Sequence, residues 1–184
     1  RATLVGCGLA IFQQLTGINA IMFYSNMIFK GLDMTATMVT ALIAIVNFLS
    51  AIVGLVLLAF AGRKTLMFWF NLAMSLTLFS LAYFAFQHNT TGMVTCVLLF
   101  IVFFEFSSGP IISLYLAETM KDKAVSLAFS LNWATSLVIS IAIPFLVKRY
   151  HVGYIFLAFA SFTVLGTIFI AFFMVETMGK TQAQ

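Results

Sequence analysis

Charged residues are scarce in this 184-residue sequence. Asp, Glu, Lys and Arg together make up 8% of it and 63% is hydrophobic, against roughly 25% and 45–50% in soluble globular proteins. No stretch is polar enough to form a soluble domain. Runs of about 18 or more mostly apolar residues, each able to cross a bilayer core, recur along the whole chain. The composition excludes a soluble protein and predicts an all-α, polytopic membrane protein in which residues 1–184 form one bundle.

Other missing features narrow the function. The two cysteines, Cys7 and Cys96, both stand inside apolar runs, where a lone cysteine is usually a small hydrophobic residue. The sequence contains no nucleophile beside a base, no metal-ligand spacing and no phosphate-binding loop. Its formal charge of +4 is spread over the connections rather than gathered in a patch. We therefore expect no enzyme activity, no cofactor, no metal and no nucleic-acid partner.

Charges, glycines and polar clusters divide the chain into six apolar spans. These are Thr3 to Phe29, Thr35 to Phe60, Thr65 to Phe86, Met93 to Ala117, Ala124 to Val147 and Gly153 to Val175. Short connections make neighbouring spans pack antiparallel, so an even number places both ends on one side. The cations on that side are Arg1, Arg63, Lys64, Lys121, Lys123 and Lys180, and those on the other are Lys30, Lys148 and Arg149. Because an excess of cations marks the cytoplasmic side, we expect both termini in the cytoplasm.

The same orientation places Asn89-Thr90-Thr91 outside the cell. This triplet matches a glycosylation sequon, although chance in a polar connection explains it at least as well. The sequence begins with Arg1 rather than Met and shows no signal-peptide pattern. We expect it to be the interior or the end of a longer protein.

Three amide side chains, those of Gln13, Gln14 and Asn19, stand in the middle of the first span. Carboxamides in hydrocarbon cost free energy unless they are hydrogen-bonded, so they need partners from other helices, from water or from a polar ligand. On an unbroken helix Gln14 and Asn19 would point about 140° apart. A break near Gly17 would bring them together. The alternative role for these amides is to hold helices together by interhelical hydrogen bonds.

The fourth span combines similar features. Glu105 is the only carboxylate well inside a span, and Gly109 and Pro110 follow shortly after it. Proline removes one helical hydrogen bond and clashes with the preceding turn. Interrupted helices at matching positions of an inverted repeat indicate the midplane binding site of a transporter. We therefore predict a 3+3 repeat with breaks in spans one and four; a protonated, purely structural Glu105 is the alternative.

Five motifs follow one another along the whole chain: QQLTGINAIMFYSNMIF, AGRK, FFEFSSGPIISLYLAE, LNWATS and VETMGKT. In this order they resemble helix seven, the loop after helix eight, helix ten, helix eleven and the segment after helix twelve of the sugar porters. These are the GLUT-type hexose transporters of the major facilitator superfamily. The resemblance implies the C-terminal six-helix half of a twelve-helix transporter, which moves a neutral sugar by alternating access together with an N-terminal half or another membrane subunit. It also favours the plasma membrane over an organelle.

The resemblance implies roles for particular residues. The sugar site would comprise Gln13, Gln14, Asn19, Asn47, Glu105, Asn132 and Trp133. Gating would involve Gly17, Phe23, Tyr24, Gly109 and Pro110. A cytoplasmic salt-bridge network would consist of Arg63, Lys64, Glu118, Glu176 and Lys180.

Several positions depart from the family pattern. Ile112 and Ser113 stand where the family has a proline and a tryptophan, and Val175 replaces the proline before the helix-twelve glutamate. Ala59 and Phe60 replace an acidic residue and an arginine. These changes motivate a second hypothesis, a transporter-like structural or assembly subunit of a larger membrane complex that keeps the fold without transporting sugar.

Overall fold

The computed structural model describes residues 2–29 and 35–179, and leaves out the side chains of residues 23, 24, 26–29 and 36. The described residues form eight α-helices and no strand: α1 (Ala2–Leu15), α2 (Ile18–Phe29), α3 (Ala36–Phe60), α4 (Arg63–Phe86), α5 (Thr90–Phe106), α6 (Ser108–Thr119), α7 (Asp122–Arg149) and α8 (Val152–Phe173). Because α1 leads into α2 and α5 into α6, the described residues contain six spans long and apolar enough to cross a membrane. The predicted all-α class and six spans are confirmed.

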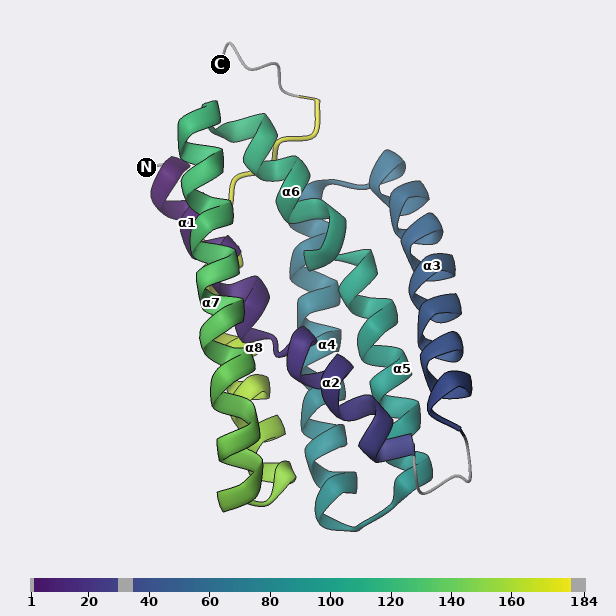
Figure 1. Cartoon of the computed structure of the whole chain (residues 1–184). Coiled ribbons are helices and arrows are strands. Elements are labelled where there is room, and N and C mark those ends of the chain that lie inside the picture. Colours follow the sequence, from purple (N-terminus) through teal and green to yellow (C-terminus); the bar gives the residue numbers. More distant parts are fainter. Residues whose placement is uncertain (1, 30–34, 180–184) are drawn as a thin grey trace.

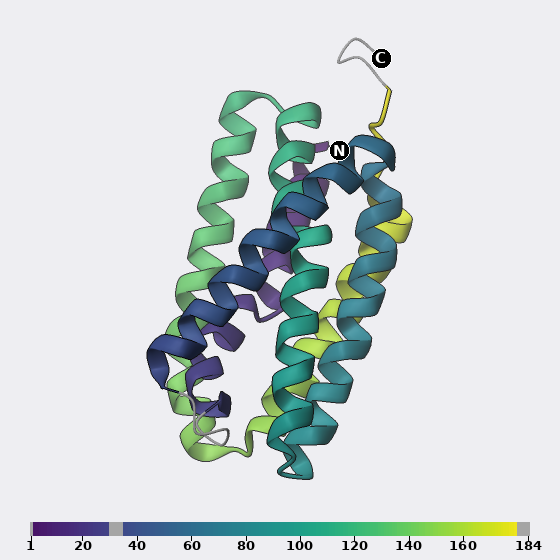
Figure 2. The ribbon, with the colours of Figure 1, turned by 90° about the vertical axis from the view of Figure 1, so that its right-hand side faces the viewer.

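The spans pack as one bundle, with each neighbour in sequence running in the opposite direction (Figures 1 and 2). In Figure 1 the start of α1 lies at the same end as the α3–α4 and α6–α7 turns and the segment after α8. The α4–α5 and α7–α8 turns lie at the other end. Asn89 begins α5 there, because its side chain accepts a hydrogen bond from the Gly92 N–H.

The interior consists of two apolar clusters with a polar layer between them. One cluster contains Met74 and Phe100, and the other contains Met67 and Leu116, all of them fully buried. In each span that takes part, buried polar side chains stand between the residues of one apolar cluster and the residues of the other. They are Gln14, Thr16, Ser50, Asn71, Ser107, Ser108, Asn132, Ser136, Thr163 and Thr167. The layer crosses the bundle about halfway along its spans, where hydrocarbon would surround it in a membrane.

The helices α3 and α7 are the least buried spans. In an apolar 18-residue stretch of each of these two helices 22% is buried, against 44–56% in the corresponding stretches of the other four spans of the described chain. Their exposed side chains are mostly apolar; examples are Phe48 and Ile52 on α3 and Leu137 and Ile141 on α7. These two helices therefore offer apolar surface to lipid or to another protein.

Gly17 ends α1 and separates it from α2, as the sequence predicts. Its φ of +83° is a conformation that side chains with a Cβ rarely adopt. A Cβ at this position would also lie 2.6 Å from the Phe159 ring of α8. Both the backbone angle and the contact with Phe159 thus require glycine here.

The second break lies at Ser107, which has φ −129° and ψ −96°. The sequence predicts a break at Gly109-Pro110, but both residues belong to the first turn of α6. A proline is tolerated in the first turn of a helix, because an N–H at that position would have no helical partner. Its ring clashes with the carbonyl four residues earlier, so a helix cannot continue without interruption through that carbonyl to the proline. That carbonyl belongs to Phe106, the last residue of α5. The prediction of a break is confirmed, and its predicted position was a few residues too late.

We expect Gly17→Ala to destabilise the protein by about 1–3 kcal/mol, because an L-residue at positive φ is strained and the new methyl group meets Phe159. The measurement is the thermal melting midpoint of the purified protein. Gly166→Ala is the matched control, since its Cβ would lie 3.3 Å from Phe12 inside a regular helix. Equal midpoints for the two variants would contradict this account of Gly17.

Candidate functional site

Four amide side chains form one continuous chain of hydrogen bonds across the polar layer. Asn19 Nδ2 donates to Gln14 Oε1 at 2.8 Å, and Gln14 Nε2 donates to Asn132 Oδ1 at 2.8 Å. Asn132 Nδ2 donates to Gln13 Oε1 at 2.8 Å, and Gln13 Nε2 donates to the Ser108 carbonyl at 2.6 Å. The chain therefore links α1, α2 and α7 to the start of α6. The break at Gly17 makes it possible, since Gln14 and Asn19 lie on opposite sides of the break and still contact each other.

Two neighbours of the amide chain, Ser136 and Asn71, stand at positions that the sequence analysis did not single out. Ser136 Oγ accepts the second hydrogen of Asn19 Nδ2 at 2.6 Å. Asn71 on α4 donates to Ser108 Oγ at 3.3 Å and is 4% exposed. Ser136 stands four residues after Asn132 on the same face of α7, so the i, i+4 spacing of two polar residues was a usable signal. Asn71 could have been recognised as the only amide side chain inside the third apolar span.

The side of Gln13 that faces α4 and α8 leaves little room. A cavity there has a volume of about 10 Å³ and is lined by polar groups of Gln13, Thr16, Asn71, Ser108 and Thr163 among other residues. That volume holds about one water molecule.

Glu105 and Asn47 form a second polar pair beside the break between α5 and α6. Asn47 Nδ2 donates to Glu105 Oε1 at 2.9 Å. Glu105 Oε2 lies near Gly109 in the first turn of α6, where the helix dipole favours negative charge. Gly54 brings α3 close to this break, because a Cβ at Gly54 would collide with the Glu105 carbonyl. The structure thus brings together two of the residues predicted for the sugar site.

The remaining predicted residues are less closely placed. Trp133 follows Asn132 on α7, but its side chain is 69% exposed and does not pack into the amide chain. Ile112 is buried in the apolar cluster around Leu116, and Ser113 is exposed on α6. The side chains of Phe23 and Tyr24, predicted to act in gating, lie outside the described residues.

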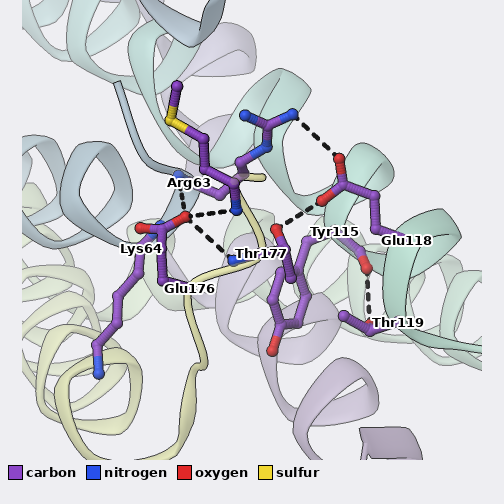
Figure 3. Close-up of polar contacts among 8 residues, drawn as sticks. Arg63, Lys64, Tyr115, Glu118, Thr119, Glu176 and Thr177 are labelled. Carbon is purple, nitrogen blue, oxygen red and sulfur yellow. Dashed lines mark hydrogen bonds and ion pairs between the residues drawn. The ribbon is translucent and has the colours of Figure 1, made fainter. Parts of the chain in front are cut away.

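At the end of the bundle where α4 begins, Arg63 and Glu118 form an ion pair with 3.1 Å between Nη2 and Oε1 (Figure 3). Glu118 Oε2 accepts a hydrogen bond of 2.6 Å from the Thr177 hydroxyl. The Tyr115 hydroxyl accepts a longer bond of 3.3 Å from the Val175 N–H. These contacts join α4 and α6 to the segment that follows α8.

Glu176 acts on the backbone rather than on a cationic side chain. Its Oε1 accepts hydrogen bonds from the N–H groups of Arg63 (2.8 Å), Thr177 (3.1 Å) and Met178 (3.1 Å), and its Oε2 accepts one from Lys64 N–H (3.1 Å). Gly62, which precedes α4, has no side chain to bond these N–H groups, and a Cβ there would collide with the Glu176 carboxylate. Glu176 therefore caps α4 from the other end of the chain.

Only part of the predicted salt-bridge network consists of ion pairs. Among the described residues, Arg63–Glu118 is the one salt bridge. Lys64 Nζ donates instead to the Ala171 carbonyl near the end of α8, at 2.9 Å. Lys180 lies outside the described residues. The network as drawn in Figure 3 is mainly made of carboxylate-to-backbone hydrogen bonds, which sequence spacing does not reveal.

Two interrupted spans around a polar layer at membrane depth are the arrangement that is typical of secondary transporters built from inverted repeats. The chain belongs to the sugar transporter family, whose model, described as "Sugar (and other) transporter", matches residues 1–184. No group of three or more His, Cys, Asp and Glu side chains in the described residues could hold a metal ion.

Named relatives agree with this family. The facilitated trehalose transporter Tret1 of Drosophila erecta is 34% identical over 96% of this chain, and the Tret1 of Bombyx mori is 31% identical over 98%. The solved structure of the proton:xylose symporter XylE bound to 6-bromo-6-deoxy-D-glucose matches with a TM-score of 0.88 at 26% identity, over 98% of this chain. The chain spans 22% of the Drosophila protein, 38% of the Bombyx protein and 41% of the XylE chain.

We expect Glu176→Gln to lower the free energy of unfolding by about 1–3 kcal/mol, because an NH2 group would then face a backbone N–H. Thermal melting measures the loss, and faster hydrogen exchange at the Arg63 and Lys64 amides locates it. Asp122→Asn is the matched control, an exposed carboxylate in the first turn of α7. A melting midpoint for Glu176→Gln no lower than that of the control would show that the carboxylate does not stabilise α4.

Proposed function

We propose that this chain is the sugar-binding C-terminal half of a transporter that moves a neutral sugar, a hexose, across a membrane by alternating access. The observation that carries the proposal is the chain of amides at two helix breaks in the polar layer. An amide offers one acceptor and one NH2 donor, which match the adjacent hydroxyls of a sugar. Neutral amides also avoid the strong binding of a charged site, which would slow release.

The proposed sugar site consists of Gln13, Gln14 and Asn19 with Asn47, Glu105 and Trp133. Asn132, also predicted for this site, bonds to Gln13 and Gln14 and supports them from behind. Glu105 and Asn47 approach the amides from the other helix break, since Ser108 joins the amide chain three residues after Glu105. Trp133 supports the proposal through its exposed indole, which can cover the apolar face of a sugar ring. Gly17, Gly109 and Pro110 lie where bending of the broken spans would open or close the site; the same role is proposed for Phe23 and Tyr24.

The substrate class follows from the site and from the relatives. Their names specify trehalose and xylose, both neutral sugars. Among the described residues at the depth of the polar layer, Glu105 is the only carboxylate and there is no Lys or Arg. Such a layer suits a neutral substrate. The hexose assignment rests on the resemblance of the helix-seven motif.

Transport requires a partner for this half, for which we propose an N-terminal six-helix half. One observation supports it. The apolar surfaces of α3 and α7 are the least buried in the described chain, so these two helices offer the area that a second half would cover.

The excess of Lys and Arg at the end of the bundle that holds Arg63 favours the cytoplasm for that end. We propose that both termini face the cytoplasm and that the protein resides in the plasma membrane. The ion pair of Arg63 with Glu118 and the cap that Glu176 provides would then form a cytoplasmic latch. Alternating access breaks and remakes such contacts in each cycle.

We expect Gln14→Ala to reduce saturable sugar uptake roughly tenfold or more, because two hydrogen bonds are lost: Asn132 Oδ1 loses its donor and Asn19 Nδ2 loses one of its two acceptors. The assay is uptake of radiolabelled glucose, xylose and trehalose into vesicles that hold this chain together with the upstream half. Gln87→Ala is the matched control, an exposed glutamine at the end of α4.

Glu105→Gln tests the carboxylate in the same vesicles. The change keeps the acceptor for Asn47, so the fold should persist while uptake falls several-fold through loss of the charge at the break. No saturable uptake of any of the three sugars, or full uptake by both variants, would contradict the proposal.

The second candidate function is a structural or assembly subunit of a larger membrane complex. Ile112 and Ser113 favour it, because α6 lacks the proline and tryptophan of the family pattern there. Stoichiometric purification with a complex whose activity is independent of sugar would support this candidate. Sugar binding by the purified chain and its N-terminal half alone would exclude it.

A further inference from the structure

Asn132 uses nearly all of its hydrogen-bonding capacity inside the protein. Its Nδ2 donates to the Ala10 carbonyl and to Gln13 Oε1, each at 2.8 Å, and its Oδ1 accepts from Gln14 Nε2 at 2.8 Å. The residue is 6% exposed even in this chain by itself. A side chain with both donors engaged and little access to solvent is poorly placed to bind a ligand directly. Its contacts instead act on the amides around it.

Two backbone carbonyls determine which way the amides point. An amide side chain can turn over and exchange its oxygen with its nitrogen, unless a neighbour can only accept or only donate. The Ala10 carbonyl only accepts, so Asn132 must direct its NH2 toward Ala10. The Ser108 carbonyl likewise requires the NH2 of Gln13. The oxygen of Asn132 then faces Gln14, which must present its NH2 to Asn132 and its oxygen to Asn19.

The amide chain ends at Asn19 with an open acceptor. Asn19 Nδ2 donates to Gln14 Oε1 and to Ser136 Oγ, which engages both of its hydrogens. Asn19 Oδ1 accepts no hydrogen bond from the described residues. If Asn19 Oδ1 were also buried, it would be a buried polar atom without a partner, and among the described residues Arg63 Nε is the only such side-chain nitrogen or oxygen. Asn19 Oδ1 is therefore accessible to water. A ligand at this end of the amide chain therefore meets an oxygen and not an NH2 group.

We propose that Asn132 is a positioning residue that fixes the orientation of the amides, so that the sugar must donate a hydroxyl hydrogen to Asn19 Oδ1. The inference rests on the proposed sugar site and adds a specificity rule to it. A hydroxyl group can donate this hydrogen bond, whereas a fluorine or a methoxy oxygen can only accept. The site therefore selects polyols with a free hydroxyl at the position that faces Asn19 and rejects analogues that carry only an acceptor there.

The experiment compares the binding of D-glucose with that of its monofluoro-deoxy analogues to the protein joined to its N-terminal half. We expect at least one analogue to bind roughly three- to tenfold more weakly than glucose, the cost of one lost hydrogen bond. In Asn132→Leu this preference should fall to within about twofold, because Gln14 and Asn19 can then turn over and offer an NH2 to the fluorine.

Asn71→Leu is the matched control, a buried asparagine that contacts Ser108 outside the chain of four amides. It should keep the preference even where it lowers the melting midpoint, so a merely structural effect is separated from a change in specificity. Asn132→Ser replaces the leucine variant if that variant does not fold, because a hydroxyl can donate or accept in either direction. An unchanged preference in Asn132→Leu or Asn132→Ser overturns the positioning role. Absence of glucose binding by the unmodified protein is a different result, which contradicts the proposed function and the positioning role with it.

Discussion

The need to pair buried amides inside a membrane is the constraint on which this structure depends. Hydrocarbon offers no hydrogen-bond partner, so each carboxamide at mid-depth must find one on another helix. Gln13, Gln14, Asn19 and Asn132 meet this need by bonding to one another and to the Ser108 and Ala10 carbonyls. The amides thus hold three spans together. At the Asn19 end of this chain the same bonds leave an acceptor, Asn19 Oδ1, without a partner among the described residues.

The two helix breaks exist to make this pairing possible. At Gly17 the chain changes direction so that side chains on both sides of the break can meet, and the Phe159 ring fills the space that a Cβ would need. At Ser107 the break puts the start of α6, with the Ser108 carbonyl, beside α1. Apolar packing above and below the polar layer keeps both breaks in place. In the proposed function the binding site and the hinge are therefore the same few residues.

Much of the fold could be predicted from local sequence. Hydropathy is a property of each segment, so the six spans were predicted within a few residues of where the helices lie. Gly17 was recognisable because it stands among amides in an apolar run. The second break was placed too late, because the proline is visible in the sequence while the carbonyl that it excludes, on Phe106, lies four residues earlier. The role of Glu176 as a cap on α4 could not be predicted, since it depends on backbone groups more than a hundred residues away.

The sequence by itself determined that the chain crosses a membrane in six spans and that polar side chains stand at mid-depth in two broken ones. Those conclusions depend on composition and on backbone chemistry that each segment carries with it. Tertiary structure decided which way each amide points and which carboxylates pair with cations. The partners of Gln13 and Gln14 are 95 and 118 residues away, and the only ion pair among the described residues joins α4 to α6. An amide reads the same in sequence whichever way it faces, and only its neighbours in space determine whether it offers a ligand an oxygen or a hydrogen.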